Sequence, residues 1–131
     1  MDAAAAEAEI RDLHVFFQQW LGGILPATPE AFAPLEAALA PEFSMVAPTG
    51  RRLDRAAVIG WLQAAHGQRG ADFRIWIEEV SEIARGPGFI AMAYDECQSL
   101  AGGDTRRRAT ALLRPAGGRL VWVLVHETWA G

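Results

Sequence analysis

The residues best suited to chemistry lie in the second half of the chain, on segments that alternate in hydrophobicity. A two-residue hairpin loop at Gly117-Gly118 would place Arg108 opposite Glu127, and a three-residue loop at 101–103 would place Glu96 opposite Arg108. These pairings predict one row, Glu96–Arg108–Glu127, across three strands. An arginine between two carboxylates on a largely apolar face shifts their pKa values toward those needed for proton transfer or anion binding. The alternative interpretation is a structural ion pair at the solvated end of the sheet.

The last strand leaves one choice open, because adjacent residues of a strand point to opposite faces. The same register predicts a second row, Tyr94–Thr110–Val125, and a slip of one residue would put His126 in the place of Glu127. Alternate residues before Glu127 are all valine, which makes a uniform apolar surface for helices to pack against. We therefore predict that Glu127 faces inward and keep His126 as the alternative pocket residue.

The histidines and the cysteine indicate neither a metal site nor a nucleophile. His66 follows the third helical segment, where it is either a general base near neutral pH or a cation at the helix C-terminus. His14 lies beside the apolar stripe of the first helical segment, and we predict that it packs there. Neither histidine has a close partner in sequence, and Cys97 follows Glu96, which raises a thiol pKa. We predict no metal and no cofactor.

Five tryptophans supply large flat surfaces. Trp20, Trp61 and Trp129 are predicted to line a pocket for a flat or aromatic ligand, and Trp76 and Trp122 to lie on the outer face of the sheet. The alternative is that they fill the core and an interface.

Composition excludes several classes of protein. Of 131 residues, 51% are hydrophobic, so the chain is not disordered, and no apolar run approaches the length of a membrane span. The net charge is −4 and every basic residue is arginine, which argues against a nucleic-acid surface despite the run at 106–108. A start without a secretory pattern and a single cysteine lead us to expect a cytoplasmic protein.

The pattern along the chain predicts one α+β domain spanning 1–131. Apolar residues recur at helical spacing in 3–21, in a second helix capped by Thr28 and in a third helix capped by Asp54. From residue 72 the period changes to two, as in strands. We expect three N-terminal helices packed in a strongly curved antiparallel sheet. The expected strands are 43–48, one from 72 onward, 89–98, 106–114 and 120–129.

A set of short motifs in fixed order gives the chain a family resemblance. They are Leu39-Ala-Pro-Glu-Phe43, Pro48-Thr-Gly50, Tyr94-x-Glu96, Arg108-x-Thr110 and Trp122-x-x-x-His126-Glu-Thr-Trp129. In this order the chain resembles the nuclear transport factor 2-like superfamily, which has a cystatin-like fold and includes ketosteroid isomerases and polyketide cyclases. It looks most like the small uncharacterised bacterial members. The resemblance implies a cone with a pocket at its wide end, lined by the first and third helices, and homodimers formed through the convex sheet face.

Three functions are compatible with these features. The first is a small-molecule binding domain with a partly apolar pocket anchored by arginine and carboxylates. The second is a cofactor-free acid/base enzyme of isomerase, dehydratase or cyclase type, and the third is a homo-oligomerisation module without a ligand. The resemblance to steroid isomerases does not extend to their aspartate, tyrosine and protonated acid, since Tyr94 is the only tyrosine and lies on a strand.

Each function assigns roles to named residues. The predicted ligand-binding residues are Trp20, Trp61, Tyr94, Thr110, Trp129 and His126. In the enzyme, Glu96 or Glu127 is the base, Arg108 stabilises charge and His66 is an accessory acid. A homodimer is expected to show a concentration-independent mass near twice 14.2 kDa.

Overall fold

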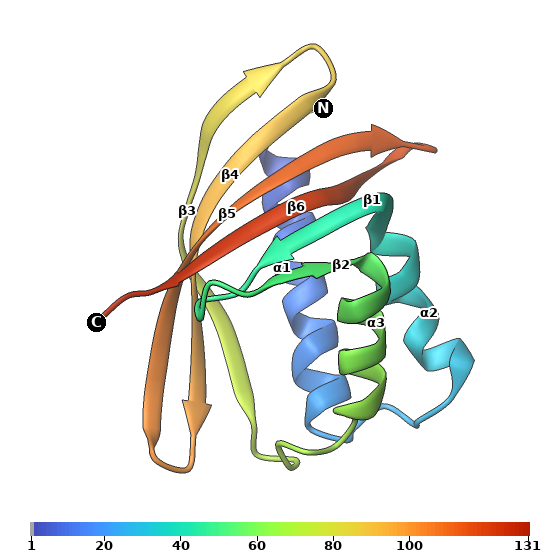
Figure 1. Cartoon of the computed structure of the whole chain (residues 1–131), viewed down its shortest axis with the longest axis vertical. Coiled ribbons are helices and arrows are strands. Elements are labelled where there is room, and N and C mark those ends of the chain that lie inside the picture. Colours follow the sequence, from blue (N-terminus) through green and yellow to red (C-terminus); the bar gives the residue numbers. More distant parts are fainter. Residues whose placement is uncertain (1) are drawn as a thin grey trace.

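The computed structural model describes residues 2–131, in which three helices precede most of a six-stranded sheet (Figure 1). The helices are α1 (Ala3–Leu21), α2 (Pro29–Ala38) and α3 (Arg55–Ala64). At the start of the three helices, the side-chain oxygens of Asp2, Thr28 and Asp54, respectively, accept a hydrogen bond from a backbone N–H of the first turn. The predicted caps Thr28 and Asp54 are therefore confirmed. No helix in this part of the chain is long and apolar enough to cross a membrane.

The sheet has the strand order β2-β1-β6-β5-β4-β3. Its strands are β1 (Leu39–Val46), β2 (Arg52–Asp54), β3 (Arg74–Gly86), β4 (Phe89–Leu100), β5 (Gly103–Ala116) and β6 (Arg119–Trp129). Neighbouring strands are antiparallel except β1 and β6, which are parallel because the chain returns from β5 to run beside its first strand. This order confirms the α+β class and places β6 between an early strand and a late one.

The sheet curves around α1, and α2 and α3 cover the open side (Figure 1). The concave face and the helices share one apolar core, whose largest fully buried side chains include Trp122, Phe32 and Ile10. β4 is buried along almost its whole length, on both faces. Charged side chains on its inner face are therefore held away from water, and each of them needs a partner.

The β5–β6 hairpin begins in the predicted register and then departs from it. Its turn is Gly117-Gly118, and both glycines have the positive φ that such a turn requires. The register shifts where Leu113 pairs with Trp122 but Leu112 pairs with Leu124, so that Val123 has no partner on β5. This β-bulge moves every later pair by one residue and reverses the alternation of β6.

The β4–β5 hairpin differs by one residue as well. Leu100 pairs with Gly103, which leaves a two-residue turn, Ala101-Gly102, in place of the predicted three-residue loop. Glu96 therefore pairs with Arg107, and not with Arg108. The predicted row Glu96–Arg108–Glu127 is wrong, because the shorter turn pairs Glu96 with Arg107 and the bulge pairs Glu127 with Ala109.

Candidate functional site

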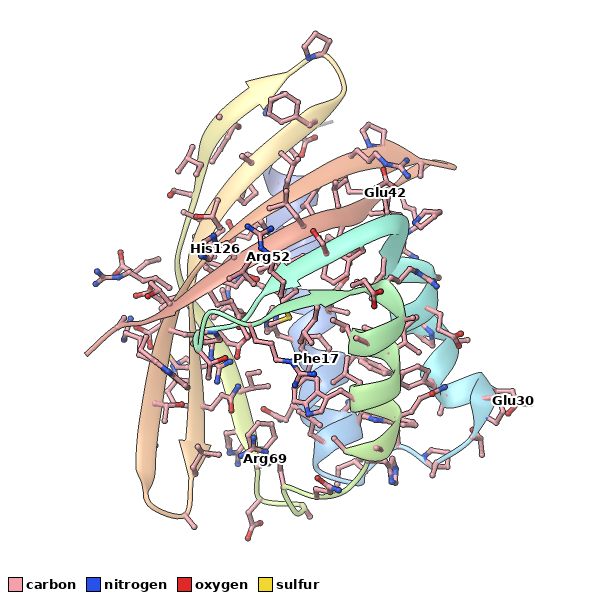
Figure 2. The ribbon with its side chains drawn as sticks, viewed as in Figure 1. Phe17, Glu30, Glu42, Arg52, Arg69 and His126 are labelled. Atoms are coloured by element: carbon pink, nitrogen blue, oxygen red, sulfur yellow. The ribbon has the colours of Figure 1, made fainter. Side chains whose placement is uncertain are left out.

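The space enclosed by the curved sheet contains a cavity of about 80 Å³ between its concave face, α1 and α3. Its walls are mostly apolar and aromatic. Phe17, which points from α1 into the enclosed space (Figure 2), contributes to them, and Trp61 of α3 lines the cavity while remaining half exposed. The polar residues of the lining are His14, Tyr94, Glu96, Gln98, Arg107 and Glu127.

His14 and Glu96 form a buried pair at the base of the cavity. His14 Nε2 lies 2.8 Å from Glu96 Oε1, and His14 Nδ1 lies 2.7 Å from the carbonyl oxygen of Ile10. A carbonyl oxygen can only accept, so Nδ1 carries a hydrogen and the pair shares one further proton across Nε2 and Oε1. Burial opposes the charged forms. The hydrogen bond and mutual attraction outweigh burial, and they raise the pKa of His14 and lower the pKa of Glu96.

Arg107 lies between the two inner carboxylates. Its Nη1 donates to Glu127 Oε1 at 3.2 Å, and its Nε lies 3.4 Å from Glu96 Oε2. Within residues 2–131, Arg107 Nε is buried and makes no hydrogen bond. The guanidinium also stacks over the indole ring of Trp129, with 4.7 Å from Cζ to the ring centre. Arg107 is thus fixed by three side chains, and its buried Nε makes no hydrogen bond.

Glu127 titrates near neutral pH. Burial and the negative charge of Glu96 outweigh the attraction of Arg107, and they raise the pKa of Glu127 from its ordinary value of 4.5 to about 7. One carboxyl in the cavity therefore gains or loses a proton within the physiological range, which suits general acid or base chemistry.

Tyr94 and Gln98 complete the polar end. Gln98 Nε2 donates to Glu96 Oε2 at 2.7 Å, so both oxygens of Glu96 are occupied. Burial raises the pKa of Tyr94 well above its ordinary value, so its hydroxyl keeps its proton. In the part of the chain that the structure describes, that hydroxyl has no hydrogen-bond partner although it lines the cavity. The cavity thus offers an unused donor from Tyr94 beside the positive charge of Arg107.

The predicted inner residues fall into two groups. Glu96, Glu127, Tyr94 and Trp61 all line the cavity. Arg108, in contrast, lies on the outer face with 71% of its side chain exposed, 3.6 Å from Asp95. Of the two alternatives on β6, Glu127 faces inward.

Trp129, predicted to line the pocket, is 52% exposed and is not part of the cavity lining, although it contacts Arg107. Thr110 and His126 also lie outside the cavity. They pair with each other across β5 and β6, and both are exposed, away from the cavity lining. Thr110 lies on the same face as Arg108 because the two alternate along β5, and the pairing places His126 on that face too. Their predicted contact with a ligand inside the cone does not fit this placement.

The predicted residues Trp20 and His66 form a separate contact beneath the helices. Trp20 Nε1 donates to the carbonyl oxygen of Leu62 at 2.7 Å, and His66 Nε2 donates to that of Leu25 at 2.6 Å. Their rings meet edge to face at 4.6 Å. The first bond joins α1 to α3 and the second joins the segments that follow these helices, and neither residue is part of the cavity lining.

Two residues of the site were placed elsewhere by sequence reasoning. His14 was predicted only to pack. A buried histidine needs hydrogen-bond partners for its ring nitrogens, and this requirement is the signal that could have indicated a polar neighbour such as Glu96. Trp122 was predicted on the outer face but lines the cavity, because the bulge after it reverses the alternation. Its indole Nε1 donates to Glu9 Oε2 of α1 at 3.1 Å.

Metal ligation has no basis in the described residues, where no group of three or more histidine, cysteine or acidic side chains is suitably arranged. The site instead combines one permanently charged guanidinium, a histidine–carboxylate pair that shares a proton, and a carboxyl that titrates near pH 7. Such an arrangement can hold a polar group of a ligand and exchange one proton with it.

Comparison with known proteins places the chain in a family. Residues 6–131 match the family described as sucrose-6-phosphate phosphohydrolase C-terminal. The chain is similar to an NTF-2-like protein of unknown function from Pseudomonas aeruginosa, at 36% identity over 97% of this chain and 99% of that one, with a TM-score of 0.89. No curated protein matches the sequence.

More distant structures share the fold. An uncharacterised protein with a cystatin-like fold from Caulobacter vibrioides is 15% identical over 98% of this chain and 89% of that one, with a TM-score of 0.75. A CamKII hub homology domain from Chlamydamonas reinhardtii is 13% identical over 98% of each chain, with a TM-score of 0.68. The predicted resemblance is therefore confirmed, and the chain belongs to the sucrose-6-phosphate phosphohydrolase C-terminal family and to the NTF2-like superfamily.

Proposed function

We propose that the protein binds a small, partly apolar molecule in the cavity between α1, α3 and the concave sheet face. The observation that carries this proposal is the polar end of an otherwise apolar cavity. There, Arg107 Nε and the Tyr94 hydroxyl have no hydrogen-bond partner within residues 2–131. A donor without a partner inside a protein costs stability, and a ligand that accepts from the Tyr94 hydroxyl in the cavity would remove that part of the cost.

The size of the cavity limits the ligand. One water molecule needs roughly 10–15 Å³ of such space, so a cavity of about 80 Å³ holds about five to eight non-hydrogen atoms. Trp61 lines the cavity and is half exposed, so a movement of its side chain would enlarge the cavity for a larger molecule. The family name refers to sucrose-6-phosphate, but a phosphate dianion would add two negative charges beside Glu96 and Glu127. We therefore do not extend that substrate to this cavity.

Filling the cavity tests the proposal. Val58 of α3 is buried and lines the cavity, so Val58→Phe is expected to weaken binding of small fragments at least about tenfold while costing about 1–3 kcal/mol of stability. Titration of a fragment library, followed by protein NMR chemical shifts, measures the affinities. The matched control is Val15→Phe on the exposed face of α1, which should leave every affinity unchanged. Fragments that bind Val58→Phe as tightly as the natural protein would refute the cavity as the binding site.

A second candidate function is a cofactor-free acid/base enzyme, favoured by the raised pKa of Glu127 inside the cavity. Glu127 would abstract a proton from carbon in a small carbonyl compound, and Arg107 and Tyr94 would stabilise the developing negative charge. Solvent deuterium uptake into a panel of small ketones and esters is the measurement. We expect uptake to rise as pH passes about 7 and to fall at least about 100-fold in Glu127→Gln. Equal uptake in that variant would leave binding as the function.

We also propose that two copies associate through the outer face of the sheet. Several similar structures are named as association or hub domains, which is said of those proteins only. On this chain, Leu112 and Leu124 pair on the outer face and are only partly buried. A mass near twice 14.2 kDa is expected in solution, and Leu124→Arg should halve it. A monomer at all concentrations would contradict the proposal.

A further inference from the structure

We infer that the cavity takes a small monocarboxylic acid with a branched or cyclic apolar body, bound as its anion against Arg107 while Glu127 holds a proton. The inference rests on the proposed binding function and adds the chemical class of the ligand. It follows from the charges and the hydrogen-bond partners at the polar end of the cavity.

The first step is the charge of the buried groups. His14 and Glu96 share one proton whichever of them carries it, and together they form a pair without net charge. Arg107 is always positive. The only other ionisable group of the lining that changes charge near neutral pH is Glu127, because Tyr94 keeps its proton. With Glu127 protonated, the described lining carries one positive charge.

A monoanion neutralises that charge, whereas a cation or a dianion does not. An ammonium ligand would leave one net positive charge even with Glu127 ionised. A dianion would leave one net negative charge with Glu127 protonated. Since uncompensated charge inside a protein is costly, a monoanion with protonated Glu127 is the charged combination that the lining accepts.

The second step is geometry. Arg107 Nη1 already donates to Glu127 at 3.2 Å, and Arg107 Nε is buried without a hydrogen bond. Trp129 covers one face of the guanidinium, and Glu96 Oε2 lies 3.4 Å from Nε without accepting a hydrogen bond from it. A carboxylate accepts from Arg107 and from the Tyr94 hydroxyl, and a protonated Glu127 donates to it as well. The unpaired hydroxyl of Tyr94 then has an acceptor.

The third step concerns the surroundings of Glu127. The charged and titratable groups that face it are Arg107 from β5, Glu96 and Tyr94 from β4, and His14 from α1, while α3 and β1 contribute only apolar side chains to the lining. Burial and the negative charge of Glu96 raise the pKa of Glu127 to about 7. A further negative charge from the ligand favours the protonated form of Glu127. Binding of the anion is therefore linked to proton uptake.

The remainder of the lining selects the body of the ligand. Phe17, Trp61 and Trp122 supply aromatic walls, and leucine, valine and methionine side chains close the rest. Charged or strongly polar groups beyond the carboxylate would have no partner there. An acid of about five to eight non-hydrogen atoms matches the space.

Three probes with the same branched apolar body test the inference: isovalerate, isovaleramide and isoamylamine, which are anionic, neutral and cationic. NMR titration measures each Kd at about pH 6.5, about 7.5 and about 8.5. We expect isovalerate to bind more tightly than the amide at the lowest pH, with a Kd that rises up to about tenfold per unit above pH 7. The amide should show a flat profile, and the amine should bind at least about tenfold more weakly than isovalerate.

Variants separate proton uptake from a merely structural role of Glu127. Glu127→Gln keeps a donor and an acceptor without titrating, so its Kd for isovalerate should no longer change with pH. Glu30→Gln, on the exposed surface of α2 (Figure 2), should retain the profile of the natural protein. A pH-independent Kd for isovalerate in the natural protein, or equal binding of acid and amide, overturns the inference and leaves the binding function standing. Failure of all three probes also overturns it, while the fragment library and Val58→Phe test the binding function separately.

Discussion

Arg107→Met is expected to lower the free energy of unfolding by about 3–5 kcal/mol at a pH above 7. The substitution keeps most of the apolar bulk of the side chain and removes its charge. It leaves Glu96 and Glu127, which are 5% and 6% exposed, as two buried carboxylates with only His14 to compensate them. It also removes the stacking of the guanidinium on Trp129. Urea denaturation followed by tryptophan fluorescence measures the loss.

Arg108→Met is the matched control, since the same substitution one residue later lies on the opposite face of β5. Arg108 is 71% exposed and lies 3.6 Å from Asp95, which Arg106 already binds at 2.7 Å. Its replacement should cost less than about 1 kcal/mol. A larger loss of unfolding free energy for Arg108→Met than for Arg107→Met would mean that Arg108, and not Arg107, lies between the two carboxylates.

Glu127→Gln is expected to make the protein more stable than its natural form at pH 8, and similarly stable at pH 5. The folded protein holds the Glu127 proton up to about pH 7, whereas the unfolded chain releases it near 4.5. Folding therefore takes up a proton between these values, and stability falls as pH rises through this window. The difference corresponds to roughly 3 kcal/mol from this one group. Glutamine has no proton to lose and avoids that cost.

Denaturation curves of both proteins at pH 5, 6, 7 and 8 provide the measurement. Glu30→Gln again serves as the control, because an exposed carboxyl contributes little to the difference between folded and unfolded states. Parallel stability profiles for Glu127→Gln and the natural protein would show that Glu127 titrates at an ordinary pKa. That result would also remove the support for its role as an acid or base.

Local signals in the sequence were sufficient for the helices and for the general form of the sheet. The first helix was predicted at 3–21 and is observed at Ala3–Leu21, and Thr28 and Asp54 cap the next two as expected. Capping and periodicity depend on residues close together in the sequence, so a single chain reveals them. The parallel pairing of β1 with β6 joins segments about 80 residues apart, and no local pattern indicates it.

The site was predicted in kind but not in detail. Two carboxylates and an arginine do meet on the concave face, yet the arginine is Arg107. Which arginine lies beside the carboxylates depends on the length of the β4–β5 turn and on the unpaired residue Val123 in β6. Neither feature changes the apolar pattern from which the register of the strands was predicted. His14 was missed for a related reason, because its partner Glu96 lies 82 residues away.

The bulge at Val123 divides β6 into two parts in which the alternation of inward-facing and outward-facing residues is opposite. Toward the turn, residues of even number face the core, as Trp122 does; toward the C-terminus, residues of odd number do, as Val125 and Glu127 do. Loss or gain of a single residue at this point would exchange the inner and outer sets of the C-terminal part, while the hairpin turn stayed in place. A family of cones built this way can therefore acquire a new set of interior side chains by an insertion or deletion of one residue, without any substitution inside the cavity.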